Sequence, residues 1–82
     1  MPTIARFYNI IIKMHYLEDE HCPPHIHAWC NGNEGVFNIS SCELIRGFLP
    51  NKIIGHVKDF INKHKDRLLE MWNKQNFEKL EY

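Results

Sequence analysis

The sequence predicts an α+β fold, in which a small antiparallel sheet of three to five strands carries a C-terminal helical segment on one face. Two observations support this prediction. Before Pro50 the apolar residues fall in short runs rich in β-branched and aromatic side chains, which are typical of strands. After Pro50 they recur every three or four positions, which is the spacing of one side of a helix. We therefore expect one domain over residues 1–82, β-rich from 1 to 49 and helical from 50 to 82.

The expected strands follow one another closely along the chain. The segments with strand character are residues 3–7, 10–17, 24–30, 35–40 and 44–48. Among these, 3–7 is the candidate for an edge strand. The proline pair Pro23-Pro24 suits a strand start, and the Asn- and Gly-rich segment 31–35 is a strong turn signal.

The expected helix covers residues 50–75. Its apolar stripe consists of Ile53, Val57, Ile61, His64, Leu68 and Trp72. Pro50 fits the start, because proline is tolerated in the first turn of a helix. The polar run 62–66 leaves two alternatives, which are one long helix or two shorter helices. We expect His64 to be a core-edge residue hydrogen-bonded to backbone, and His56 to lie on the helix surface.

Composition limits the classes of function. The 82 residues carry no net charge, so there is no global positive footprint for nucleic acid or for a membrane surface. No apolar run approaches the ~20 residues that span a bilayer. We expect a cytoplasmic protein without a membrane partner. An odd number of cysteines then indicates reduced thiols rather than a disulfide framework.

Histidines are concentrated in the segment 22–30, which reads CPPHIHAWC. Successive side chains on a strand point to opposite faces. If Ile26 and Ala28 face the helix, then His25 and His27 project from the uncovered face. Lys13 and His15, on the neighbouring strand, are expected beside them. We expect both histidines of the pair to be partly exposed, with like-charge repulsion lowering the pKa of some of the cluster below ~6.5.

The same segment raises the question of a metal site. Cys22, His25, His27 and Cys30 are acceptable zinc ligands by type. A strand sends Cys30 to the face opposite the two histidines, so the four cannot converge without a bulge. An open site made by the histidine pair with His15 is the alternative. We predict no metal and no other cofactor, with the cysteines acting as small buried hydrophobes. Histidines on a half-exposed sheet face also need no function at all.

Five short segments, taken in their order along the chain, carry a resemblance to a known family. They are Met1–Tyr8 (MPTIARFY), Pro23–Ala28 (PPHIHA), Val36–Ile39 (VFNI), Gly47–Pro50 (GFLP) and Leu68–Trp72 (LLEMW). Over nearly the whole chain, the sequence resembles a family of small bacterial proteins known only as a domain of unknown function. Members of that family open with MPTI-x-RFYG and carry PPHFHA. The cysteines and His15 are not part of the pattern, Asn9 stands where glycine is usual, and Lys13 stands where arginine is frequent.

The resemblance implies a small cytoplasmic protein whose gene sits beside that of a second small protein. Such pairs look like toxin–antitoxin modules, and some members are regarded as the toxin half. The family pattern singles out Arg6, Phe7, Tyr8, Pro23, Pro24, His25, His27 and Ala28.

Two hypotheses of function follow. The first is a toxin-like protein that cleaves RNA without metal. His25 and His27 would be the acid–base pair, because histidine titrates near neutral pH, and Lys13 or Arg6 would stabilise the phosphorane charge. The expected binding residues are Tyr8, His15, Trp29 and Asn38. The second is a non-catalytic module that docks the adjacent-gene partner through the same face. Either way, we expect association with that partner, an antitoxin-like protein, or with a second copy.

Overall fold

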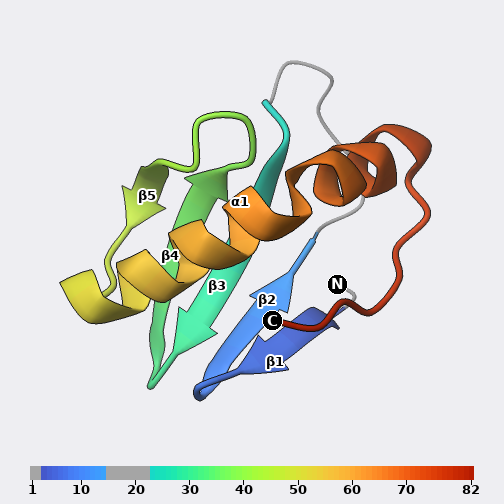
Figure 1. Cartoon of the computed structure of the whole chain (residues 1–82). Coiled ribbons are helices and arrows are strands. Elements are labelled where there is room, and N and C mark those ends of the chain that lie inside the picture. The colour runs from blue at the N-terminus through green and yellow to red at the C-terminus, as the bar shows by residue number, and fades with distance from the viewer. Residues whose placement is uncertain (1–2, 15–22) are drawn as a thin grey trace.

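The computed structural model describes residues 3–14 and 23–82, and it has an α+β fold, as predicted (Figure 1). The elements in chain order are β1 (Thr3–Phe7), β2 (Ile10–Lys13), β3 (His25–Cys30), β4 (Asn33–Asn38), β5 (Leu44–Gly47) and α1 (Asn51–Lys74). Within the described residues no helix precedes the sheet and no strand follows Pro50. The change of apolar period at Pro50 therefore marks the real boundary.

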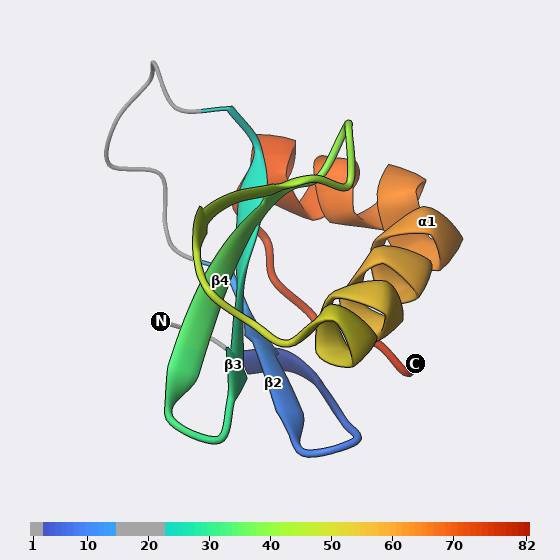
Figure 2. The ribbon, with the colours of Figure 1, turned by 90° about the vertical axis from the view of Figure 1, so that its left-hand side faces the viewer.

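The strands form one antiparallel sheet in the order β1-β2-β3-β4-β5, so each strand pairs with its neighbour in sequence. The helix crosses one face of this sheet, and Figure 2 shows the two layers edge-on. Among the described elements, none of helical form lies on the opposite face. Two of the connections, at 8–9 and 31–32, are two-residue turns, which is all that antiparallel neighbours need.

Two turns have both central residues in the left-handed region. Asn31 and Gly32 have φ of 50° and 82°, and they join β3 to β4. Tyr8 and Asn9 have φ of 48° and 61°, and they join β1 to β2. Positive φ at both positions is the hairpin geometry that matches strand twist. Asparagine therefore replaces the usual glycine at position 9 without loss of the turn, whereas Tyr8 adopts a conformation that is strained for a bulky residue.

Strand limits differ from the prediction at two places. The expected strand 10–17 ends at Lys13, with Met14 outside it, and residues 15–17 lie outside the described residues. The expected strand 35–40 instead spans 33–38, because the turn takes only two residues and not the five of the segment 31–35. Ser40 consequently lies in an exposed turn rather than on the polar face of a strand.

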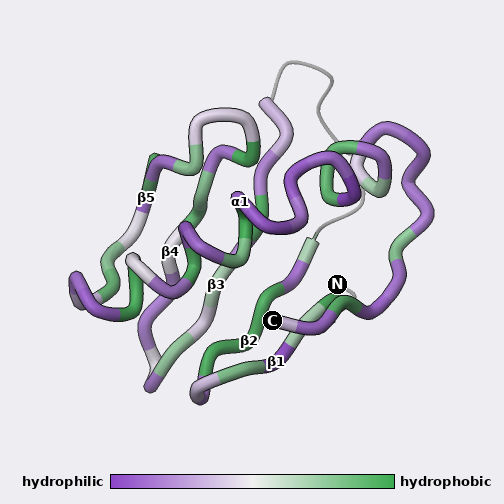
Figure 3. The backbone as a smooth tube through the Cα atoms, viewed as in Figure 1, coloured by the Kyte–Doolittle hydropathy of each residue, from purple (hydrophilic) through white to green (hydrophobic). Residues whose placement is uncertain are grey.

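The core lies between the sheet and α1. Alternate strand residues supply one side of it, and they include Ile10, Ile12, Ile26, Ala28 and Phe37. The helix supplies Val57, Phe60, Ile61, Leu68, Met71 and Trp72. Figure 3 shows hydrophilic and hydrophobic residues mixed along α1, as expected for a helix with one buried side. Cys30 and Cys42 are buried free thiols, as expected of these two cysteines.

The helix is continuous in hydrogen bonding but kinked at His64, which has non-helical φ and ψ of −115° and 18°. The kink falls inside the polar run 62–66, so the two sequence alternatives are both partly correct. Across residues 3–14 and 23–82, no helix has both the length and the apolar character needed to cross a membrane.

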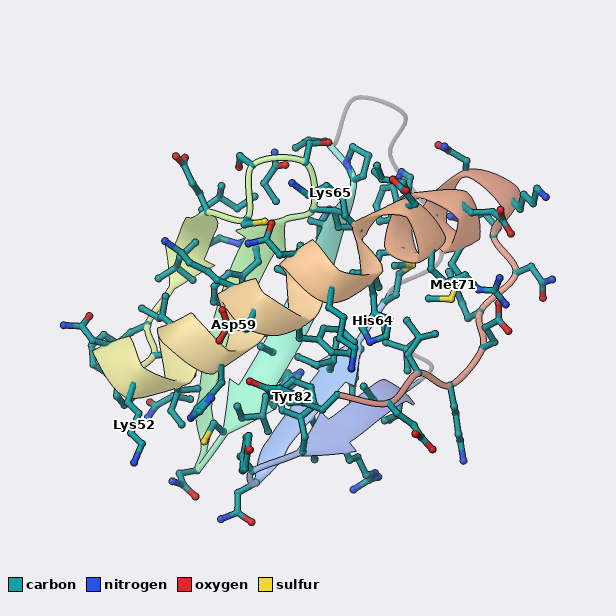
Figure 4. The ribbon with its side chains drawn as sticks, in the orientation of Figure 1. Lys52, Asp59, His64, Lys65, Met71 and Tyr82 are labelled. Atoms are coloured by element: carbon teal, nitrogen blue, oxygen red, sulfur yellow. The ribbon has the colours of Figure 1, made fainter. Side chains whose placement is uncertain are left out.

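After α1, residues 76–82 return as an irregular tail along the helix and β1. The amide of Leu80 donates to the carbonyl of Ile4 at 2.6 Å, and Nε2 of His64 donates to the carbonyl of Glu81 at 2.5 Å (Figure 4). The ring of Tyr82 meets Phe7 edge-on, with centroids 4.4 Å apart. His64 is thus half-buried and bonded to backbone, as predicted. The helical part expected over residues 50–82 therefore ends at Lys74, and the irregular tail after it was not predicted.

Candidate functional site

The site is built on the sheet face opposite α1. His27 pairs with Lys13 of β2 on one side and with Val36 of β4 on the other. Its sequence neighbours Ile26 and Ala28 are fully buried in the core. Because residues that pair directly across antiparallel strands share a face, Lys13, His27 and Val36 form one row across the uncovered face.

Glu34 holds the imidazole of His27. In the register, Glu34 lies opposite Trp29 and therefore diagonally from His27 on the same face. Nδ1–H of His27 donates to Oε2 of Glu34 over 2.9 Å. This bond fixes the ring orientation and makes Nε2 the acceptor nitrogen of the neutral ring.

His27 is more buried than predicted. Only 7% of the residue is exposed, although the helix does not cover this face. Neighbouring side chains enclose the ring instead, among them His25, Val36 and Glu34. The expectation of a partly exposed His27 is therefore wrong, because it considered the helix as the only source of burial.

Burial also decides the protonation of His27. Its pKa is lowered from the ordinary 6.5, and desolvation of the charged ring is the main cause. The carboxylate of Glu34 opposes this change, through both its hydrogen bond and its charge, while the charges of His25 and Arg46 add smaller lowering effects. The predicted direction holds for His27, but like-charge repulsion is only a minor cause.

His25 lies at the rim between the two faces. Its ring centroid is 5.2 Å from that of His27 and 4.9 Å from that of Trp72 on α1. It is partly exposed, as predicted, but the contact with Trp72 means that it does not point purely away from the helix. Nδ1–H donates to the carbonyl of Pro23 over 2.8 Å, so Nε2 is the nitrogen that can serve a ligand.

Two more predicted residues stand in the same neighbourhood. Nζ of Lys13 lies 5.8 Å from the centroid of the Trp29 ring, a cation–π contact. Trp29 is half-buried, and its Nε1 is buried without a hydrogen-bond partner among the described residues. Lys13 therefore lies beside His27 as expected, and its ammonium group lies over the ring of Trp29.

Of the remaining predicted residues, Arg6 and Tyr8 lie away from the histidines, whereas Asn38 pairs with His25 across β3 and β4. Arg6 is exposed and pairs with Ile11, two strands away from β3. Tyr8 is 64% exposed, and its ring contacts His56 of α1 with centroids 4.6 Å apart. Oδ1 of Asn38 accepts from the amide of Ser41 and so shapes the turn after β4. His15 lies outside the described residues. The β1–β2 turn carries Tyr8 to the helix side, away from the histidine pair, and its binding role stays a prediction.

Sequence reasoning missed Glu34 and Arg46. Glu34 was assigned to the turn, but a two-residue Asn-Gly turn would have placed it opposite Trp29 and thus beside His27. Arg46 pairs with Val36 across β4 and β5, so it extends the row of His27. A register shift between Val36 and Phe37 sets this pairing, and the sequence carries no clear signal for it.

The suggested zinc ligands that lie within residues 3–14 and 23–82 are not brought together as one site. Cys30 is buried in the core on the opposite side of β3, while Cys22 and His15 lie outside the described residues. Among residues 3–14 and 23–82, no three His, Cys, Asp or Glu side chains are grouped as ligands of one metal ion would be.

Comparison with known proteins places the chain in a family. Residues 9–73 match the family described as Domain of unknown function (DUF4160). No curated protein and no solved structure matches the chain. The match covers β2 to α1, and therefore includes the histidine pair, Glu34 and Arg46. This chain belongs to the DUF4160 family.

Proposed function

We propose that this protein is the toxin-like component of a bacterial toxin–antitoxin-like pair, and that it acts in the cytoplasm on RNA through the histidine face. The observation that carries the proposal is the pairing of two imidazoles, with centroids 5.2 Å apart, one of which is held by a carboxylate. Two cations flank this pair in the sheet, Lys13 on β2 and Arg46 on β5.

The arrangement fits metal-independent cleavage of a phosphodiester. His27, whose lowered pKa keeps it neutral at pH 7, is the base that takes the 2′-hydroxyl proton at Nε2. The 2′-oxygen attacks phosphorus, and a 2′,3′-cyclic phosphate forms. The 5′-oxygen leaves with the Nε2 proton of His25, whose ring acts in its protonated form because Nδ1–H is held by the carbonyl of Pro23. Lys13 and Arg46 stabilise the charge on the phosphorane oxygens.

The test is cleavage of a short RNA by the purified chain, together with growth on induction. We expect a cyclic-phosphate product, and no cleavage of a substrate with 2′-deoxyribose at the cut site. His25→Ala and His27→Ala should each lose at least 100-fold in rate, since a general acid or base contributes about 10²–10⁴-fold. His56→Ala is the matched control, because His56 lies on α1.

The low exposure of His27 favours a second candidate, a module that docks a protein. The partner would be the small antitoxin-like product of the neighbouring gene, with Ile45 and Phe48, 50% and 65% exposed, as apolar contacts next to the histidine face. An RNA that stays intact, together with co-purification that Phe48→Ala weakens, would favour docking over catalysis. Loss of cleavage in the histidine variants with normal partner capture would favour catalysis.

A further inference from the structure

A small pocket opens beside the histidine pair, at the edge of the sheet formed by β5. It has a volume of about 210 Å³, and Pro23, His25, Val36, Ile45 and Arg46 line it. Sites for drug-sized ligands usually occupy about 300–1,000 Å³. The pocket therefore suits a fragment no larger than a phosphate group and the adjoining part of a sugar.

The pocket contains one permanent cation. Arg46 is exposed, and it forms no ion pair with the described residues. Its pairing with Val36 puts it on the same face as His27. A guanidinium stays charged at all physiological pH values and presents a planar set of donors that matches two phosphate oxygens at once.

His25 supplies a second donor on the pocket wall when its ring is protonated, because both ring nitrogens then carry hydrogen. Nδ1–H donates to the carbonyl of Pro23, so Nε2–H remains for a ligand. The contacts with His27 and Trp72 hold the ring in place. The other three lining residues, Pro23, Val36 and Ile45, are apolar and offer no hydrogen-bonding side chain to an ion. Such a wall favours a phosphate that carries an organic group over a free inorganic ion.

We propose that this pocket binds one phosphate of a single-stranded RNA, with Arg46 as the clamp on its oxygens and Nε2 of His25 as the second donor. The inference rests on the proposed function and names Arg46, instead of the predicted Arg6, as the arginine of the site. It also explains how a chain without net charge can hold a polyanion. The cations needed are local, with Arg46 at one end of the row through His27 and Lys13 at the other.

Binding of uridine 3′-monophosphate, uridine and inorganic phosphate to the full chain tests the pocket by calorimetry. We expect the nucleotide to bind, uridine not to bind, and phosphate to bind more weakly. Arg46→Gln should weaken nucleotide binding about 10- to 150-fold, because a hydrogen bond to a charged group contributes about 1.5–3 kcal/mol. Lys58→Gln removes one positive charge from the exposed side of α1 and should leave the affinity unchanged. Circular dichroism confirms that both variants fold.

A second measurement separates a phosphate contact from a structural role. A short RNA with 2′-O-methyl groups throughout can bind but cannot be cleaved. Its affinity should fall with salt, and Arg46→Gln should reduce the slope of log K against log salt by about 0.7, the loss of one single-strand phosphate contact. Lys58→Gln should keep the wild-type slope.

The outcomes for the two proposals differ. Unchanged binding and slope in Arg46→Gln, or equal binding of uridine and its 3′-monophosphate, would overturn the pocket assignment even if RNA is cleaved. Arg46-dependent binding without any cleavage by the wild-type chain would retain the pocket and reject the catalytic function.

Discussion

The two faces of the sheet are built from the same strands but bury different kinds of side chain. On the face towards α1, Ile10, Ile26 and Phe37 are wholly buried among other apolar side chains. On the opposite face, Val36 and Glu34 lie beside the imidazole of His27. His27 and Val36 are almost as inaccessible there, at 7% and 3% exposure, although no helix lies over them.

This difference shows that burial on the uncovered face changes the protonation of a side chain, which burial of the apolar core residues does not. Removing apolar side chains from water stabilises the folded protein. An imidazole that loses water keeps its neutral form more firmly, and the carboxylate of Glu34 then sets its orientation. Burial on the uncovered face therefore lowers the pKa of His27, while burial on the covered face stabilises the fold.

The largest expected effect is a difference between the two faces in the unfolding free energy lost on substitution by alanine. Phe37→Ala empties a fully buried core position and should cost about 3–5 kcal/mol of unfolding free energy. Val36→Ala, at the adjacent position on the other face, should cost about 1.6 kcal/mol, since each buried methylene contributes ~0.8 kcal/mol. Urea denaturation measures both. Equal losses would mean that the uncovered face is a second core, and would contradict the claim that the covered face contributes more to stability.

A smaller effect concerns the strand pairing that places Glu34. Gly47 has φ of +87°, and a Cβ there would overlap the backbone carbonyl of Glu34. Because backbone cannot move aside as a flexible side chain does, Gly47→Ala should cost about 2–3 kcal/mol. Gly32→Ala is the matched control, with φ of +82° but no atom within 4 Å of the added Cβ, and should cost about 1 kcal/mol. Similar losses in urea denaturation would contradict the overlap.

The smallest effect is a dependence of stability on pH. The pKa of His27 is lower in the folded chain than the ordinary 6.5, so below pH 6.5 the unfolded chain binds more protons. Stability should therefore fall as pH drops below about 6.5, and His27 should contribute no pH dependence above it. Between pH 7.5 and 5.5 this contribution is at most about 1.4 kcal/mol.

Two variants should move this pH dependence in opposite directions. His27→Asn removes the titrating group, so the loss of stability between pH 7.5 and 5.5 should become shallower. Glu34→Gln removes the charge that raises the pKa of His27, so the folded pKa should fall further and the loss should become steeper. Urea denaturation at the two pH values checks both variants. A steeper loss in His27→Asn would show that other groups control the acid response.

Much of the fold could be predicted from sequence periodicity. The period-two runs and the helical stripe after Pro50 predicted the strands, the helix and the faces of Ile26 and Ala28, because burial follows those periods directly. The tail at 76–82 could not be predicted in this way. Its position depends on single contacts, such as the pairing of Leu80 with Ile4, and these leave no periodic pattern.

The candidate site was predictable only where it depends on one strand or one hairpin. The shared face of Lys13 and His27 follows from alternation and the β2–β3 pairing. Glu34 depends on the length of the next turn, and Arg46 on a register shift between β4 and β5. Each added strand multiplies the possible registers, so the environment that buries His27 emerges only from the complete sheet.

The strand order has a consequence for how the chain reaches its native state. Because β1 to β5 pair only with sequence neighbours, no pairing joins strands that are distant in the chain. The β1–β2 and β3–β4 pairings each close a two-residue turn and so require little loss of chain entropy. Chains dominated by such local pairings fold faster than those that must first join distant strands. We expect folding to grow from one hairpin to the next. Docking of α1 and of the tail, whose Phe77 and Leu80 pack against the core, then completes the process.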